Sequence, residues 1–413
     1  MRRINPALIV VLAGVSAALH VGKLPTAIPV LREALGVTLL EAGFLLSLVQ
    51  LAGMSLGLLV GLAADALGAK RTMVAGLAIL SFASALGSGA HDAQTLMLLR
   101  AVEGFGFLLA SMPAPSLIRR LVEASRVPLW LGLWGAYMPF GTALALLCGP
   151  FAIASLGWPL WWDMLAALSA IMGAWLWLAI PADEPLAHSS QSHGAQGWLH
   201  RLRRTLSLPG PWLIALCFAF YSSQWLAVIG FLPSIYAQSG LAAGLAGAAT
   251  ALAAAVNIAG NVTAGRLLHR GVRPHWLLYC GFLAMGAGGV LAFAPLAGEA
   301  TTVAAIRFAG VLMFSMVGGL IPGTLFSLAV RVSPDDRSTS TTLGWMHQCS
   351  AFGQFMGPPA VAWVATRMGG WSWSWLVTGA CASAGLLVAA MIGRLLRQSR
   401  YVESHAASTG ESS

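Results

Sequence analysis

Long apolar runs, separated by short polar breaks, repeat along the whole chain. A helix needs about 20 apolar residues to cross a bilayer, and twelve runs of that kind can be marked in the 413-residue sequence. The pattern therefore predicts an all-α integral membrane protein with twelve transmembrane helices. The predicted spans are 7–28, 38–62, 71–90, 94–118, 127–152, 158–180, 211–236, 241–268, 274–297, 301–330, 339–366 and 371–396.

One polar segment interrupts this pattern near the middle of the chain. It is rich in Ser, His and Pro, and it separates six spans from the next six. We expect an N-terminal six-helix bundle at 1–180, a cytoplasmic linker at 181–210, a C-terminal six-helix bundle at 211–400 and a disordered tail at 401–413. Within the linker, 198–208 is basic and amphipathic, so it either lies on the membrane surface or acts as a plain tether.

Composition supports the membrane class and the charges indicate the topology. Only 9% of the residues are charged, against roughly 25% in a soluble domain. The net charge of +9 does not indicate nucleic-acid binding, because the basic residues lie in short loops between apolar spans. With a cytoplasmic N-terminus, the inner segments receive nearly all of these residues and the outer loops only Arg32 and Arg367, so both termini are predicted to be cytoplasmic. We expect a multi-pass protein of the inner (plasma) membrane.

The two halves of the chain repeat several local features. Arg100 precedes a proline in the fourth span, and Arg307 precedes one in the tenth. The fifth and eleventh spans each end in a Gly-Trp pair, at Gly157 and Gly370. Such repetition is typical of a duplicated transporter with its site near mid-membrane, between the halves.

The break between the second and third spans carries the most distinctive motif. Its polar and glycine positions are Gly61, Asp65, Gly68, Lys70 and Arg71. Glycines allow two helices to approach closely across a tight turn. A carboxylate at a helix C-terminus is disfavoured by the macrodipole unless a nearby cation compensates, so Asp65 is predicted to form a charged clasp with Lys70 and Arg71. The alternative is an ordinary basic loop with an incidental Asp.

With these residues in hand, the chain resembles the major facilitator superfamily of transporters along nearly its whole length. The stretch from Leu96 through Arg100 to Gly106 is similar to that family's arginine motif, with Glu103 where Gln is common, and Ala66 departs from the usual Arg. The segments 22–32 and 231–233 are similar to the cyanate and nitroimidazole permease branch. The resemblance implies two six-helix bundles, alternating access, a small-molecule substrate and, in many members, proton coupling.

Ionisable side chains inside a membrane are costly and are functional candidates by default. Counted from the outer span ends at ~1.5 Å per residue, Lys23, Arg100 and Arg307 lie roughly 8–10 Å deep, which predicts a cationic tier in the outer third of the cavity. Three cations against Glu103 favour an anionic substrate. The alternatives are that Arg100 pairs with Glu103 or Glu41 and is only structural, and that Arg307 snorkels to the interface.

The remaining candidates are uncharged or titratable polar residues. His20 and Glu103 are the predicted proton-coupling pair, with helix packing as the alternative for His20. Neutral candidates for substrate contact complete the predicted site: Tyr137, Tyr221, Gln224 and His347. No cofactor and no metal site is expected, although the run of Met346, His347 and Cys349 leaves copper transport as a minor alternative. Tryptophans at span ends, including Trp158, Trp161 and Trp162, are read as interfacial anchors.

The sequence thus predicts a secondary transporter, not an enzyme, that moves a small anion across the membrane as a monomer with possible proton coupling. An exporter of neutral or cationic drug-like compounds and a membrane sensor with a transporter fold remain alternatives. The chain lacks paired acids or a nucleophile constellation at one depth, and no phosphate-binding loop for ATP is present.

Overall fold

The computed structural model describes residues 5–183, 195–334 and 338–409, with only the backbone described for segments such as 61–67, 195–199 and 399–409. Every regular element in these ranges is a helix. The α-helices are α1 (Pro6–Leu35), α2 (Leu39–Ser47), α3 (Leu51–Leu67), α4 (Ala69–Ser88), α5 (Ala93–Ser111), α6 (Ala114–Leu121), α7 (Val127–Gly135), α8 (Tyr137–Ala179), α9 (Ala195–Ser207), α10 (Pro209–Gln238), α11 (Ala243–His269), α12 (Pro274–Phe293), α13 (Ala300–Gly318), α14 (Leu320–Val332), α15 (Thr339–Arg367) and α16 (Ser374–Thr409). Short 3-10 turns lie at Leu48–Gln50, Ala124–Arg126 and Trp371–Trp373.

These helices account for the twelve predicted spans. Ten segments of the described chain are long and apolar enough to cross a membrane. One of them, Ala124–Ala179, holds two spans, because Gly157 adopts φ 82° and ψ 160° inside α8 and reverses the chain there. The twelfth is α15, which is 29 residues long and carries more polar residues. The all-α, twelve-helix fold is therefore confirmed.

Three helices extend further than the sequence pattern suggested. α1 continues past Pro25 and Pro29 to Leu35, because a membrane helix tolerates an internal proline when its neighbours shield the freed carbonyls. Lys23 is then twelve residues, or about 18 Å, from the C-terminal end of α1, where the predicted span ended five residues after it. α9 covers the basic stretch before the seventh span. α16 runs to Thr409, past the end of the twelfth predicted span at 396 and into the segment 401–413 that was expected to be a tail.

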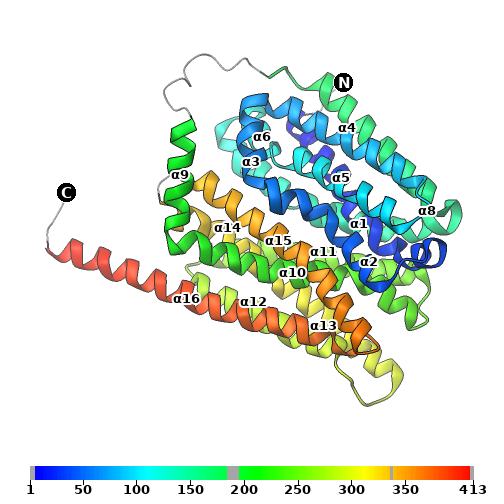
Figure 1. The fold of residues 1–413 in the computed structure, drawn as a ribbon. Coiled ribbons are helices and arrows are strands. Elements are labelled where there is room, and N and C mark those ends of the chain that lie inside the picture. The colour runs from blue at the N-terminus through cyan, green and yellow to red at the C-terminus, as the bar shows by residue number, and fades with distance from the viewer. Residues whose placement is uncertain (1–4, 184–194, 335–337, 410–413) are drawn as a thin grey trace.

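The helices form two groups that follow the order of the chain (Figure 1). α1 to α8 pack together, with α1 against α8 and α4 between α5 and α8, and α10 to α16 form the second group. We call these groups the N-terminal half and the C-terminal half. They touch where α2 and α3 meet α15, where α8 meets α11, and where α1 meets α10.

Close helix contacts in the C-terminal half depend on glycine. A Cβ at Gly353 of α15 would lie 2.2 Å from the Ala219 carbonyl oxygen of α10, and one at Gly357 would lie 2.1 Å from the Ser223 carbonyl oxygen. Small residues at such a seam let two backbones approach directly, which is how helices associate inside lipid. This seam fixes α15 firmly to the C-terminal half while its other side faces α2 and α3.

Candidate functional site

Four ionisable side chains meet inside the N-terminal half. Lys23 of α1 and Arg100 and Glu103 of α5 are each at most 2% exposed, and His20 is fully buried. The Lys23 ammonium donates to Glu103 Oε1 at 2.5 Å and to Ser84 Oγ at 2.8 Å, and its third contact is His20 Nδ1 at 3.3 Å. All three ammonium protons therefore have acceptors, as a buried positive charge requires.

Arg100 holds the other side of the same carboxylate. Its Nη1 donates to Glu103 Oε2 at 2.6 Å and to the His20 carbonyl oxygen at 2.7 Å, while Nε donates to the Leu45 carbonyl oxygen at 3.2 Å. Nη2 is buried and has no partner in the described part of the chain. Glu103 thus sits between two cations, and the cluster carries one net positive charge when His20 is neutral.

Contacts from α4 and α8 complete this cluster. His20 Nε2 lies 2.9 Å from Ser169 Oγ. Because a lysine ammonium only donates, its contact requires His20 Nδ1 to accept, which leaves Nε2 as the donor to Ser169. The Lys23 Nζ lies 4.6 Å from the ring centroid of Trp162, a cation–π contact. Trp162 is 1% exposed, and Trp158 and Trp161 are also buried, so reading these three as interfacial anchors was wrong.

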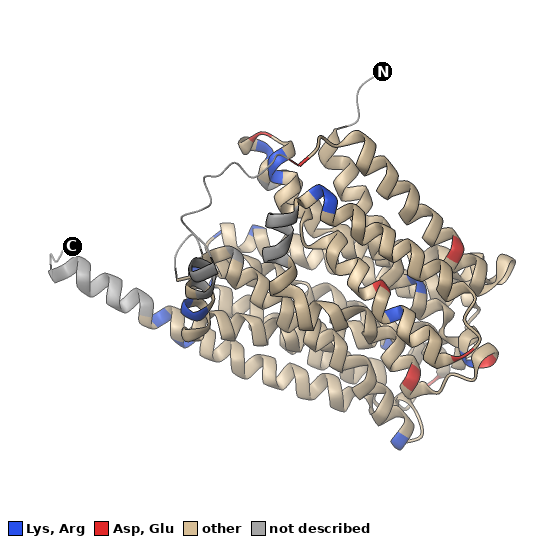
Figure 2. Cartoon of the chain, turned by 45° about the horizontal axis from the view of Figure 1, so that its top comes forward, with Lys and Arg blue, Asp and Glu red and all other residues tan. Residues whose placement is uncertain are grey.

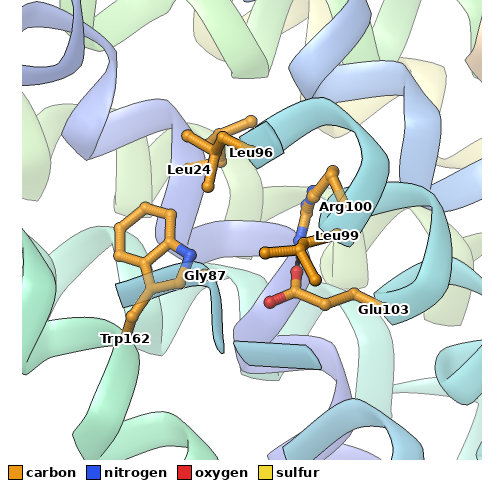
Figure 3. Close-up of a pocket in the computed structure, with 7 residues that line it drawn as sticks. All are labelled: Leu24, Gly87, Leu96, Leu99, Arg100, Glu103 and Trp162. Atoms are coloured by element: carbon orange, nitrogen blue, oxygen red, sulfur yellow. Dashed lines mark hydrogen bonds and ion pairs between the residues drawn. The ribbon is translucent and has the colours of Figure 1, made fainter. Parts of the chain in front are cut away.

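The geometry also corrects the predicted cationic tier. Lys23 and Arg100 point into the interior of the N-terminal half, among α1, α4, α5 and α8, and share one carboxylate. Arg307 lies on α13 in the C-terminal half, and no hydrogen bond or ion pair joins it to them in the described chain. The space beside the cluster, shown in Figure 3 between Trp162 and the Arg100–Glu103 pair, leaves no room for a water molecule. Glu41, the other proposed partner of Arg100, instead caps α2 through Thr38.

The C-terminal half holds a neutral network of buried polar side chains. Tyr221 and Asn257 exchange hydrogen bonds between side chains at 3.1 and 2.9 Å, and the Asn257 amide also donates to the Ser315 carbonyl oxygen at 2.8 Å. The Trp225 ring N–H donates to Ser315 Oγ at 3.1 Å. These bonds join α10, α11 and α13. Hydrogen bonds between uncharged polar side chains commonly hold membrane helices together in this way.

His347 lies on an aromatic surface beside that network. Its ring centroid is 6.0 Å from that of Phe218 and 5.5 Å from that of Phe326. At about 100° per residue, His347 lies on the face of α15 opposite the exposed Phe352 and Met356. α10 and α3 pack on the two remaining sides of α15.

The last two polar candidates, Gln224 and Tyr137, each contact a residue of the same half. Gln224 of α10 is fully buried; its amide nitrogen donates to the Phe220 carbonyl oxygen at 3.1 Å, and its Oε1 has no partner in the described chain. Tyr137 of α8 stacks on Trp134, with ring centroids 4.1 Å apart. An unpaired buried acceptor makes Gln224 the stronger of the two as a candidate for substrate contact.

The loop between the second and third spans is held by an acid that sequence reasoning missed. Asp183, just beyond α8, accepts from the backbone N–H groups of Lys70 at 3.1 Å and Arg71 at 3.0 Å, and from Arg120 at 2.9 Å. It therefore caps the N-terminus of α4. A Cβ at Gly68, where φ is +94°, would collide with its carboxylate.

The clasp predicted for Asp65 cannot be placed in the same way. The side chain of Asp65 lies outside the described residues, and only the backbone is described at Gly61. The Lys70 ammonium donates to the Ile180 carbonyl oxygen at 2.6 Å and lies 4.8 Å from the Trp177 ring. For Asp183, burial raises the pKa, but the Arg71 and Lys70 N–H groups and the Arg120 guanidinium outweigh it and hold the pKa below its ordinary value.

Comparison with known proteins identifies the fold. A family model described as Major Facilitator Superfamily matches residues 7–358. The chain belongs to this superfamily. It is a transporter built from membrane-spanning helices, as the sequence indicated, and not an enzyme.

Individual relatives are more distant. A bacterial homologue of the human lysosomal transporter Spinster, solved in inward-facing occupied and unoccupied conformations, matches with TM-scores of 0.76 and 0.75 at 16% identity, covering 95% and 94% of this chain and 96% and 94% of theirs. A D-xylose–proton symporter gives a TM-score of 0.70 at 17% identity, covering 94% of this chain and 96% of that one. The puromycin resistance protein pur8 of Streptomyces alboniger is 34% identical over 161 residues, which span 38% of this chain and only 31% of that relative.

Proposed function

We propose that this protein is a proton-coupled secondary transporter of a small organic anion, working by alternating access as a monomer in the inner membrane with both termini cytoplasmic. The observation that carries the proposal is Glu103 held between Lys23 and Arg100, with Arg100 Nη2 unpaired. Buried charge of this kind is expensive in a membrane protein and is retained where it serves transport.

Proton and anion are linked through the balance of charge around Glu103. When Glu103 takes up a proton, Lys23 and Arg100 lose their counter-ion, and two buried cations then attract an anionic group. The Arg100 guanidinium suits a carboxylate because its donors lie in a planar fork. When the anion leaves, Glu103 releases its proton and closes the cluster again, with His20 as a neighbouring proton acceptor.

Entry to this cluster requires movement of the helices around it, since the space beside it is closed to water. His347, Gln224 and Tyr221 of the C-terminal half are then proposed to contact the organic part of the substrate, with Tyr137 and Arg307 at the edges of the path. At the other end of the helices, release of Asp183 from α4 and Arg120 is proposed to accompany the change of conformation, together with the neighbouring Gly61–Arg71 motif.

A second candidate function is export of ring-bearing, drug-like compounds. It is favoured by the partly exposed aromatic surface of Phe218, Phe326 and His347, on which a ring could stack. The name of the pur8 relative, a puromycin resistance protein, points in the same direction. The resemblance of residues 22–32 and 231–233 to cyanate permeases fits the first candidate, and the nitroimidazole permeases of the same branch, whose solute is an uncharged ring, fit the second.

Counterflow in proteoliposomes separates the two candidates. The panel is cyanate and benzoate as anions, D-xylose as a neutral solute and puromycin as a cation. We expect exchange of an anion, reduced at least tenfold by Arg100→Gln, with Arg307→Gln as the matched arginine in the other half retaining more than half of the rate. Exchange of puromycin alone would support the exporter, and equal losses in the two variants would restore the tier predicted from the sequence.

A further inference from the structure

The two halves differ at the end of the helices where most arginines gather (Figure 2). In the N-terminal half, a glycine with positive φ, Gly68, precedes α4, and Arg120 lies in the last turn of α6. Asp183, which follows α8, joins these two elements through the hydrogen bonds described above. The chain supplies its own anion there, and two backbone N–H groups of α4 and the Arg120 guanidinium donate to it.

The C-terminal half repeats this arrangement without the acid. Gly271, with φ +85°, lies in the turn before α12, three residues from its start at Pro274, where Gly68 directly precedes α4. Arg331 lies in the last turn of α14 as Arg120 does in α6. Asp183 follows the last helix of the N-terminal half, and the residue near the corresponding end of the last helix of the C-terminal half, α16, is Arg397. Arg273, Arg331 and Arg397 together line a cavity of about 480 Å³, and no Asp or Glu is among its lining residues.

Three cations around one cavity repel one another unless an anion lies between them. No ion pair in the described chain involves Arg273, Arg331 or Arg397. The volume falls in the range of about 300–1,000 Å³ that is typical of ligand pockets, so the cavity has room for more than a bare ion.

The neighbouring tryptophans indicate the depth of this cavity in the membrane. Trp212 of α10 is 38% exposed and Trp276 of α12 is 57% exposed, and each lies within two residues of a residue that lines the cavity. Exposed tryptophans near helix ends lie at the level of the lipid headgroups. A phosphate at that level would lie in the cavity that the three arginines line.

We infer that this cavity is a binding site for a phosphate group, supplied by an anionic lipid headgroup or by free phosphate. Arginine forks pair bidentately with phosphate oxygens, and basic pockets between membrane helices take anionic lipid headgroups. The bound phosphate takes the position in the C-terminal half that Asp183 takes in the N-terminal half, and it ties α12, α14 and α16 together. The inference does not depend on the proposed substrate or on proton coupling.

The test uses the full-length protein, purified in a neutral detergent, with thermal unfolding and retained lipid as readouts. Phosphatidylglycerol is compared with phosphatidylcholine, and inorganic phosphate with chloride at equal ionic strength. The variant Arg273→Gln/Arg331→Gln/Arg397→Gln removes the positive charges that line the pocket, and Arg266→Gln/Arg270→Gln/Arg394→Gln removes the same charge from positions of the same half that do not line it.

We expect phosphatidylglycerol to raise the unfolding temperature and phosphatidylcholine not to, with an apparent affinity at least tenfold weaker in the pocket variant and unchanged in the control variant. A shift with inorganic phosphate alone would identify the free ion as the ligand of the same site. Equal losses in the two triple variants, or equal effects of the two lipids, would overturn the inference.

A further variant tests whether carboxylates of the chain itself occupy the arginine pocket. Asp335 and Asp336 follow Arg331 in the sequence and lie outside the described residues. The variant Asp335→Asn/Asp336→Asn should bind phosphatidylglycerol as the unmodified protein does. Clearly tighter binding would mean that these carboxylates compete for the arginines, and the pocket would then be a second internal clasp.

Discussion

The two halves of this transporter stabilise their centres with different chemistry. In the N-terminal half, Lys23, Arg100 and Glu103 form a buried charged cluster. In the C-terminal half, Tyr221 and Asn257 take part in a network with no formal charge. Both join a first helix of their half, α1 or α10, to helices that follow it.

The difference in charge between the two groups separates side chains that pack helices together from side chains that can respond to a proton. Neutral hydrogen bonds between membrane helices hold the same arrangement at any pH near neutrality, and they contribute on average about 0.6 kcal/mol each. A carboxylate between two cations changes its interactions completely when it gains a proton. In the proposed mechanism, the buried carboxylate that exchanges a proton lies in the N-terminal half, and the Tyr221–Asn257 network of the C-terminal half keeps its charge.

The largest expected effect comes from Glu103→Gln. Removing one partner of a buried charge group leaves uncompensated charge and costs about 3–5 kcal/mol, so we expect a large drop in thermal stability, measured by unfolding in detergent. The double variant Lys23→Met/Glu103→Gln retains one net positive charge, as in the unmodified protein, and should recover at least half of the lost stability. No recovery would mean that the stability of the cluster does not depend on its charge balance.

A smaller effect is expected from Asn257→Ala in the neutral network. Its hydrogen bonds to Tyr221 and Ser315 are lost, and the cost should be about 0.6–1.7 kcal/mol, read from the same unfolding measurement. Counterflow should persist, because the network does not change charge during transport. A complete loss of transport with stability intact would place Asn257 in the transport mechanism and weaken the contrast between the halves.

The smallest effect is expected at the helix end, where Asp183→Asn removes the acid that caps α4. The pKa of Asp183 is lowered in the folded protein, so its charge stabilises the fold above its ordinary pKa of about 3.9, and that contribution is lost as the pH falls through the lower folded value. The difference in unfolding temperature between the two proteins should therefore be present at pH 7 and shrink below about pH 4. A difference independent of pH would show that the charge is not what Asp183 contributes.

Much of the fold was predictable from sequence, since twelve apolar runs and their arginine bias depend on local composition alone. The pairing of Arg100 with Glu103 was also accessible, as one of two alternatives, because residues three apart share a helix face. The third member was not, because Lys23 lies 80 residues from Glu103 along the chain and only the packing of α1 against α5 brings them together.

Contacts between distant segments account for the rest. Asp183 caps a helix that starts more than a hundred residues earlier, and nothing in the polar linker sequence distinguishes it from Asp or Glu residues exposed to water. Ser84 accepts a hydrogen bond from the Lys23 ammonium, and Ser169 contacts the ring of His20. Serine is common in membrane spans, so neither residue stands out in the sequence. The rotation of a helix about its own axis decides whether its cation faces the cavity or the interior of its own half. A span that is apolar on all sides does not show that rotation in its sequence.

Substrate-driven proton movement tests the central claim most directly. A pH-sensitive dye inside proteoliposomes reports proton entry when the anion identified by counterflow is added outside. The account predicts entry of protons with the anion in the unmodified protein, and anion exchange without proton entry in Lys23→Met/Glu103→Gln. Proton entry that continues unchanged in this variant, or anion transport by the unmodified protein without any proton movement, would contradict it.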